Sequence, residues 1–166
     1  MHVIDKPGKN TVRRDRFIKE LQHDPYHSKL KLKSATQCPQ CYAVYSRGHW
    51  TWERFQKIQY HHYCPACSRI RDKVPAAYLN LSGGYVETHK RDIINLIHNY
   101  EVREKLNHPL KRVMAMREVD SELQVQFTDA HLARGVGTAL KKAHGGEIQY
   151  HYGKEDVLLR IAWSRN

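Results

Sequence analysis

The chain has 166 residues, of which 40% are hydrophobic and 27% are charged, so it is long enough for one ordinary domain or two small ones. Its mean hydropathy of −0.74 indicates a modest core, and 28 Lys and Arg against 17 Asp and Glu give a net charge of +11. Its apolar stretches are too short to cross a bilayer, and the first ten residues lack the apolar segment of a signal peptide. We therefore expect a cytoplasmic monomer rather than a membrane-spanning protein, a secreted disulfide scaffold or an acidic disordered tail.

The positive charge is concentrated at the front of the chain. Residues 1–37 contain nine Lys or Arg and four Asp or Glu, a net charge of +5, whereas residues 38–67, 68–109 and 110–166 each have a net charge of +2. A basic segment with few large apolar side chains is typical of proteins that bind phosphate backbones, because release of condensed counterions drives the association. Solubility alone is the alternative reason for a basic surface. The charge pattern favours nucleic acid, RNA especially, as the partner.

Within this segment, residues 12–22 have the pattern of one short amphipathic helix. Thr11 is a suitable N-cap, and Asp24-Pro25 ends the pattern. A helix of this length is marginal alone, so we expect residues 1–37 to form a mobile arm that becomes ordered on its partner, with a helix docked on the body as the alternative. The candidate RNA contacts of this arm are Arg13, Arg14, Arg16, Lys19, Lys29, Lys31 and Lys33.

All four cysteines of the chain occur in two CxxC motifs, Cys38-Pro-Gln-Cys41 and Cys64-Pro-Ala-Cys67, with 22 residues between them. This spacing is typical of a structural zinc site, because the two-residue gap turns both sulfurs of a motif to one side and two motifs supply four tetrahedral ligands. The proline after the first cysteine of each motif favours the tight turn. The sequence therefore predicts one structural Zn²⁺, held by Cys38, Cys41, Cys64 and Cys67, with no open position for catalysis.

Three other interpretations of the cysteines are disfavoured. Disulfides are typical of secreted proteins, and no secretion signal is evident in the sequence. A redox-active CxxC occurs singly beside a βαβ unit rather than as a matched pair. His49, His61 and His62 are possible ligands, but a complete set of cysteines makes them unnecessary. A metal that closes the segment also supplies the stability that about thirty residues cannot obtain from a core alone.

Between the two motifs, apolar residues alternate on both sides of Arg47-Gly48, which predicts a β-hairpin. A hairpin between two CxxC motifs indicates a zinc ribbon, with a treble-clef-like arrangement, over residues 38–82. Trp50 and Trp52 lie two positions apart on the expected strand, so they share a face and cover the metal site; a stacking platform for bases is the alternative. The candidate phosphate contacts near the motifs are Arg47, Arg54, Lys57, Arg69 and Arg71.

The remainder, residues 83–166, has the pattern of a two-layer α+β domain. An apolar run at residues 74–81 precedes it, and Gly83-Gly84 is expected to form a turn rather than a phosphate-binding loop, since the rest of a nucleotide-binding motif is missing. Helical periodicity predicts a helix over 87–106 that joins the helical layer. A β-β-α-β-β order follows, with strands at 111–119, 122–127, 147–152 and 157–163 and a helix capped by Asp129 and closed by Gly145-Gly146. Three cations lie off the buried stripe of that helix, on a solvated face or an RNA-binding one: Arg134, Lys141 and Lys142.

Several segments together resemble a family of small bacterial zinc-ribbon proteins of poorly defined function. They are His23-Asp24-Pro25-Tyr26, CPQCYAVY, HWTW, CPACSRIRD, HPLKRVMAM and HLARGVGTALKKAHGGE, and they extend over nearly the whole chain. More distantly, the chain is similar to the zinc-ribbon part of the archaeal and eukaryotic export adaptor of the large ribosomal subunit. That adaptor has further CxxC motifs and domains that this chain lacks. The resemblance implies binding to ribosomal RNA and a ribosomal subunit, and it carries over only the four cysteines as ligands.

The sequence thus favours a non-enzymatic, zinc-stabilised RNA-binding protein that docks on ribosomal RNA, in ribosome hibernation, assembly or quality control. A DNA-binding regulator is the alternative, although residues 68–73 are short for a recognition helix. A nuclease or other hydrolase is a further alternative. Its candidate residues are not spaced as an acid–base pair or as an open metal site: Glu53, His61, His62 and Asp72.

Overall fold

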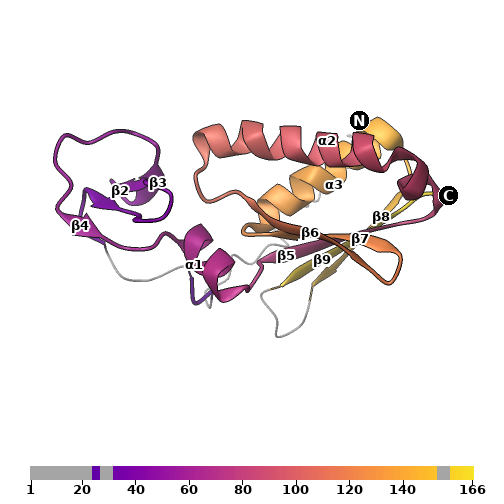
Figure 1. Cartoon of the computed structure of the whole chain (residues 1–166), viewed down its shortest axis with the longest axis horizontal. Helices are drawn as coiled ribbons and strands as arrows, with labels where there is room; N and C mark the ends of the chain where they lie inside the picture. The colour runs from indigo at the N-terminus through magenta and orange to yellow at the C-terminus, as the bar shows by residue number, and fades with distance from the viewer. Residues whose placement is uncertain (1–23, 27–31, 153–157) are drawn as a thin grey trace, which may run out of the picture.

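The computed structural model describes residues 24–26, 32–152 and 158–166. These residues form a mixed α+β structure with two β-sheets and three helices (Figure 1). A small four-stranded sheet lies at one end, a five-stranded sheet with two helices on it lies at the other, and the short helix α1 lies between them. The predicted helix over 12–22 falls outside the described residues, as do six candidate RNA contacts: Arg13, Arg14, Arg16, Lys19, Lys29 and Lys31.

The small sheet and α1 contain both CxxC motifs, and we call residues 32–73 the cysteine module. Its strand order is β3-β2-β1-β4, with β1 and β4 parallel. The predicted hairpin is confirmed, because β2 and β3 are antiparallel and Arg47 and Gly48 between them have φ of 50° and 87°, as in a type I′ turn. The elements are β1 (Thr36–Gln37), β2 (Val44–Ser46), β3 (His49–Thr51), β4 (Tyr60–His61) and α1 (Pro65–Asp72).

The larger sheet has the strand order β6-β7-β5-β9-β8, and α2 and α3 cover one of its faces (Figure 1). Inward-facing residues alternate along its central strands, as Leu79, Val125 and Ile161 do at paired positions. Trp163 is fully buried and donates its Nε1–H to the Gly145 carbonyl at 2.9 Å. The elements are β5 (Ala77–Ser82), α2 (Gly84–Asn107), β6 (Val113–Val119), β7 (Glu122–Phe127), α3 (Ala130–His144), β8 (Glu147–Tyr152) and β9 (Leu159–Ser164).

Most elements after residue 83 lie close to their predicted ranges, because local signals fix their ends. Asp129 caps α3 by accepting a hydrogen bond from the Leu132 amide at 2.7 Å, and Gly145 ends the helix with a φ of 71°. Asp120 and Ser121 both have positive φ in the turn between β6 and β7. From residue 113 onward the described elements follow one another as strand, strand, helix, strand, strand.

Two predicted domain boundaries need correction. The apolar run at 74–81 contains β5, which is the central strand of the large sheet and pairs with β7 and with β9. A boundary after residue 82 would therefore divide one core, and the α+β domain begins near residue 76. Similarly, β1 lies inside the predicted arm of residues 1–37 but pairs with β2 and β4. The folded cysteine module therefore begins before Cys38.

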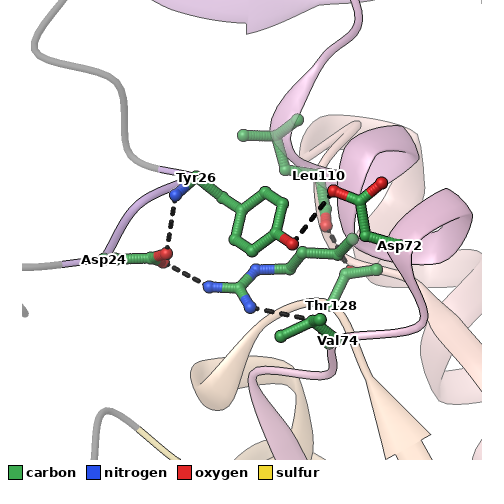
Figure 2. Close-up of polar contacts among 7 residues, drawn as sticks. Asp24, Tyr26, Asp72, Val74, Leu110 and Thr128 are labelled. Atoms are coloured by element: carbon green, nitrogen blue, oxygen red, sulfur yellow. Dashed lines mark hydrogen bonds and ion pairs between the residues drawn. The ribbon is translucent and has the colours of Figure 1, made fainter.

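A buried ion pair joins Asp24 to α1. Arg69 donates to the Asp24 carboxylate at 2.5 Å, and the two side chains are 5% and 8% exposed. The guanidinium also donates to the Val74 carbonyl at 3.2 Å, and the Tyr26 ring lies over it at 4.5 Å. Figure 2 shows the Tyr26 hydroxyl pointing to Asp72, to which it donates at 3.0 Å. The prediction that Arg69 contacts phosphate is therefore wrong, because protein groups surround its guanidinium.

Removing one partner of this pair should destabilise the protein strongly. Asp24→Ala leaves a buried guanidinium without its anion, so we expect the free energy of unfolding to fall by about 3–5 kcal/mol. Urea unfolding followed by tryptophan fluorescence measures the change. Arg71→Ala is the matched control: it breaks the exposed Arg71–Asp72 pair, which water screens, and should lower the free energy of unfolding far less than Asp24→Ala does. Equal losses in the two variants would contradict the structural role of Asp24.

Candidate metal centre

The four cysteine sulfurs converge at one point, within 4.8 Å of one another. Cys38, Cys64 and Cys67 are buried, and Cys41 is half-buried. The Cys41 and Cys64 sulfurs are 3.7 Å apart. Four sulfurs arranged tetrahedrally around one ion with bonds of about 2.3 Å would be about 3.8 Å apart, so the cluster has the dimensions of a four-thiolate metal site. The donor set therefore fits a metal ion, as the spacing predicted.

Local backbone geometry aims these sulfurs. Cys38 begins a tight turn in which its amide donates to the Ala43 carbonyl at 2.8 Å, and Tyr42 takes a φ of 66°. Cys64 is the N-cap of α1, and its sulfur accepts from the Cys67 amide at 3.4 Å. The Cys38 sulfur in turn accepts from the Cys64 amide at 3.4 Å. These amide-to-sulfur bonds favour thiolates over thiols, which is what a metal ligand requires.

Ionisation within the cluster is uneven. The hydrogen bond from Cys64 lowers the pKa of Cys41 to about 4, and the same contact together with burial raises the pKa of Cys64 far above its ordinary value. Burial raises the pKa of Cys67 to about 11. Cys41 therefore ionises readily, whereas the hydrogen bond with Cys41 and burial keep Cys64 protonated, and burial does the same for Cys67; the Cys41 charge adds to both effects. A bound cation would offset the repulsion between thiolates, so metal uptake should release protons.

A buried arginine from outside the motifs completes the centre. Arg112 is 7% exposed, and its guanidinium donates to the Cys67 sulfur at 3.2 Å, with the Cys64 sulfur at 3.9 Å. Its Nε donates to the Pro109 carbonyl at 2.8 Å, and the Trp52 ring centroid lies 5.8 Å away. Nothing in the sequence indicates this position of Arg112, since no spacing rule connects it to a cysteine 45 positions earlier. Its positive charge lies where tetrathiolate charge would accumulate.

The two tryptophans have different roles. Trp50 is 8% exposed, packs in the apolar cluster around the cysteines and meets the Tyr45 ring edge-on at 5.7 Å. Trp50 covers the cysteine cluster. The alternative prediction, that Trp50 stacks on bases, is wrong because its ring is buried. Trp52 lies beyond the end of β3, is 36% exposed and donates to the Lys105 carbonyl of α2 at 2.6 Å. Trp52 therefore links the cysteine module to the α+β domain.

The remaining candidate RNA contacts fall into two groups. One group lies on the cysteine module and is exposed: Lys33, Arg47, Arg54, Lys57 and Arg71. The other lies on α3, where Arg134 is half-buried against the Tyr150 ring and the exposed Lys141 and Lys142 occupy the last turn. These two lysines lie at the opposite end of α3 from Asp129. Five candidate cations thus belong to the cysteine module, whereas Lys141 and Lys142 belong to the α+β domain.

The residues of the hydrolase alternative do not form a comparable centre. Hydrogen bonds from Arg71 and Tyr26 hold the pKa of the Asp72 carboxyl below its ordinary value, so it is poorly suited to act as a general acid. Across residues 24–26, 32–152 and 158–166, the cysteine cluster is the one group of three or more potential metal ligands.

No protein-family model, curated protein or solved structure matched the chain. None of the helices in the described part of the chain combines the length and apolarity that a bilayer span requires. Functional inference therefore depends on the cysteine centre and on the surfaces around it.

Replacing Arg112 should weaken metal binding. Arg112→Met removes the buried positive charge beside Cys64 and Cys67, so we expect metal affinity to fall about 10–100-fold, the usual cost of losing a partner of the ligands. Arg112→Lys should fall between Met and wild type, because it keeps the charge but loses the planar fork. Competition with a chromophoric chelator measures the affinity, and circular dichroism confirms that the variants fold. Arg117→Met, on the exposed end of β6, is the control. Unchanged affinity in Arg112→Met would show that Arg112 serves packing alone.

Proposed function

We propose that the protein is a non-enzymatic RNA-binding protein, stabilised by one Zn²⁺, that docks on ribosomal RNA in a ribosomal subunit. The observation that carries the proposal is the set of exposed aromatic rings and cations on the cysteine module, in which Lys33 lies over Tyr60 and Arg71 over Tyr63. Hibernation, assembly and quality control are all roles in which such a protein would act by occupying a site on the particle.

Zinc is proposed because the ligand set is all sulfur and closed. Four thiolates in a tetrahedral arrangement suit Zn²⁺, which has no geometric preference of its own and binds sulfur at about 2.3 Å. No ligand position would remain for water, so the ion would have a structural role. The short strands of the cysteine module, of two or three residues each, need such support because they bury little apolar area.

The RNA-binding surface is defined by four exposed rings and five exposed cations, and we call it the aromatic–cation surface. Lys33 lies over the Tyr60 ring at 5.1 Å, and Arg71 lies over the Tyr63 ring at 4.9 Å. Rings and cations in this arrangement let bases stack while phosphates pair with charge, which is how many proteins bind single-stranded RNA. The rings are Tyr42, Trp52, Tyr60 and Tyr63, which are 36–69% exposed, and the cations are Lys33, Arg47, Arg54, Lys57 and Arg71.

A ribosomal target is favoured over DNA for two reasons. Helix α1 is eight residues long and uses Ala66, Cys67 and Arg69 for internal packing, so little of it is available to enter a major groove. The resemblance to the ribosomal export adaptor also implies ribosomal RNA. The net charge of +5 over residues 1–37 would add phosphate contacts to those of the aromatic–cation surface.

Native mass spectrometry should show one zinc ion per chain. Cys64→Ser should lose the ion and unfold the cysteine module while the five-stranded sheet persists, because that sheet has a separate core. Amide hydrogen exchange distinguishes the two parts. Protein purified under reducing, metal-replete conditions that contained two disulfides and no metal would contradict the proposal.

The full chain should co-sediment with ribosomal particles through a sucrose gradient, in a salt-dependent manner. If it makes about six phosphate contacts, its affinity should fall about a thousandfold between 50 and 200 mM salt. Arg47→Gln with Arg54→Gln should reduce the slope of log affinity against log salt by about two, one for each lost contact.

The matched control is Arg160→Gln, an exposed arginine on β9 outside the aromatic–cation surface, which should leave the slope unchanged. Recovery of the protein only in ribosome-free fractions at low salt, from growing and stationary cells alike, would reject ribosome binding and favour the DNA-binding alternative.

A further inference from the structure

A cleft of about 430 Å³ lies between the cysteine module and the α+β domain. The cysteine module contributes residues of the β2–β3 hairpin and residues 62–65, the opposite side is the loop of residues 108–111, and Pro25 and Tyr26 close one side. Its volume is at the lower end of the range for small-ligand sites, so it suits one planar group rather than a folded segment. Sequence analysis gave no indication of it, since its walls come from distant parts of the chain.

Flat rings with polar edges form the walls of this cleft. Its lining includes the imidazoles of His49, His62 and His108, all on exposed residues, together with the rings of Tyr45 and Tyr63. Imidazole and phenol rings present a face for stacking, and each also has an edge that donates or accepts a hydrogen bond. Proteins that read unpaired RNA bases use this combination.

The floor of the cleft is apolar and rests on the cysteine cluster. Trp50 and Leu110 both line the cleft and both pack against the apolar cluster that contains Cys38, Cys64 and Cys67. A rigid apolar floor favours a planar, weakly hydrated ligand and costs little reorganisation on binding.

Charged residues both line the cleft and lie beside it. The two ionic residues of the lining have opposite charges: Lys111, which pairs with Glu104 at 2.7 Å, and Asp129, which caps α3. Two cations lie next to lining residues, because Arg47 adjoins Gly48 in the sequence, and Arg71 stacks on Tyr63 while it pairs with Asp72. Lining charges that balance, with arginines beside them, suit a base inside and its phosphates outside.

From this geometry we propose that the cleft binds one unpaired nucleobase of the RNA whose backbone contacts the aromatic–cation surface. The inference rests on the proposed function and adds to it a site for a single flipped-out base. The imidazoles of His62, from the cysteine module, and of His108, from the α+β domain, contact the base, Tyr63 forms part of the same lining, and Arg47 and Arg71 hold the flanking phosphates.

Nucleosides test the cleft directly, without any need for the protein to bind long RNA. Two-dimensional ¹H–¹³C spectra of the metal-loaded full chain follow the histidine rings during four separate titrations. The titrants are adenosine, uridine, ribose 5-phosphate and N-acetyltyrosinamide. At least one of the two nucleosides should shift the His62 and His108 signals, and ribose 5-phosphate should leave them unchanged. Shifts with ribose 5-phosphate alone would make this a phosphate site and overturn the proposal. Shifts with N-acetyltyrosinamide but with neither nucleoside would indicate a protein partner and overturn it as well.

Oligonucleotides then separate base binding from backbone binding. His62→Ala with His108→Ala should weaken binding of a 12-residue oligoadenylate about 5- to 10-fold, on the scale of one lost stacking contact, and leave binding of an abasic 12-mer unchanged. The matched control, His61→Ala with His98→Ala, changes two exposed histidines outside the cleft and should alter neither affinity.

The outcomes distinguish this inference from the proposed function. Tight, salt-dependent binding of oligoadenylate that the cleft variant leaves unchanged would overturn the cleft site and leave the RNA-binding function intact. Failure of wild type to bind any oligonucleotide or ribosomal particle would instead reject the function, and the nucleoside titration would still decide whether the cleft takes a base.

Discussion

Four sulfurs within 4.8 Å of one another cannot all carry negative charge unless positive charge offsets their repulsion, and the rest of the structure depends on this constraint. A bound metal ion would supply most of that charge, and the buried Arg112 guanidinium supplies more. Arg112 belongs to the segment that leads into β6, so the electrostatic balance of the cysteine module involves a residue of the α+β domain. The two halves of the protein therefore meet at the cysteine cluster.

Two arginines that are buried in the described part of the chain lie at this junction, and each is held by a side-chain acceptor and a carbonyl oxygen. Arg112 donates to cysteine sulfur and to the Pro109 carbonyl, while Arg69 donates to Asp24 and to the Val74 carbonyl. A guanidinium has five donors in a fixed planar fork, a geometry that a lysine ammonium does not have. Helix α1 is fixed between the two sheets by these contacts, because Cys64, Cys67 and Arg69 all belong to it or cap it.

Local sequence signals predicted the parts of the structure that local geometry determines. The spacing of the cysteines, the hairpin turn at Arg47-Gly48 and the Asp129 cap each depend on a few adjacent residues, and each was found where predicted. Three features could not be predicted because they join distant segments. The central position of β5 depends on pairing with β9, about 80 residues later, and Arg112 and Asp24 each reach a partner 45 positions away. Trp50 and Trp52 differ because β3 ends between them, a boundary that their shared spacing does not reveal.

The position of the cleft connects the metal centre to RNA binding, if both act as proposed. Trp50 and Leu110 form the floor of the cleft and pack on the cysteine cluster, so a metal ion that orders the cluster also orders the floor. A base that binds the ordered cleft more tightly than a disordered one must, by linkage, raise the affinity of the cysteines for the metal by the same factor. Metal occupancy and RNA affinity would then both depend on the equilibrium between the ordered and the disordered cleft. The ion would then act on RNA binding without touching the RNA, through Trp50 and Leu110.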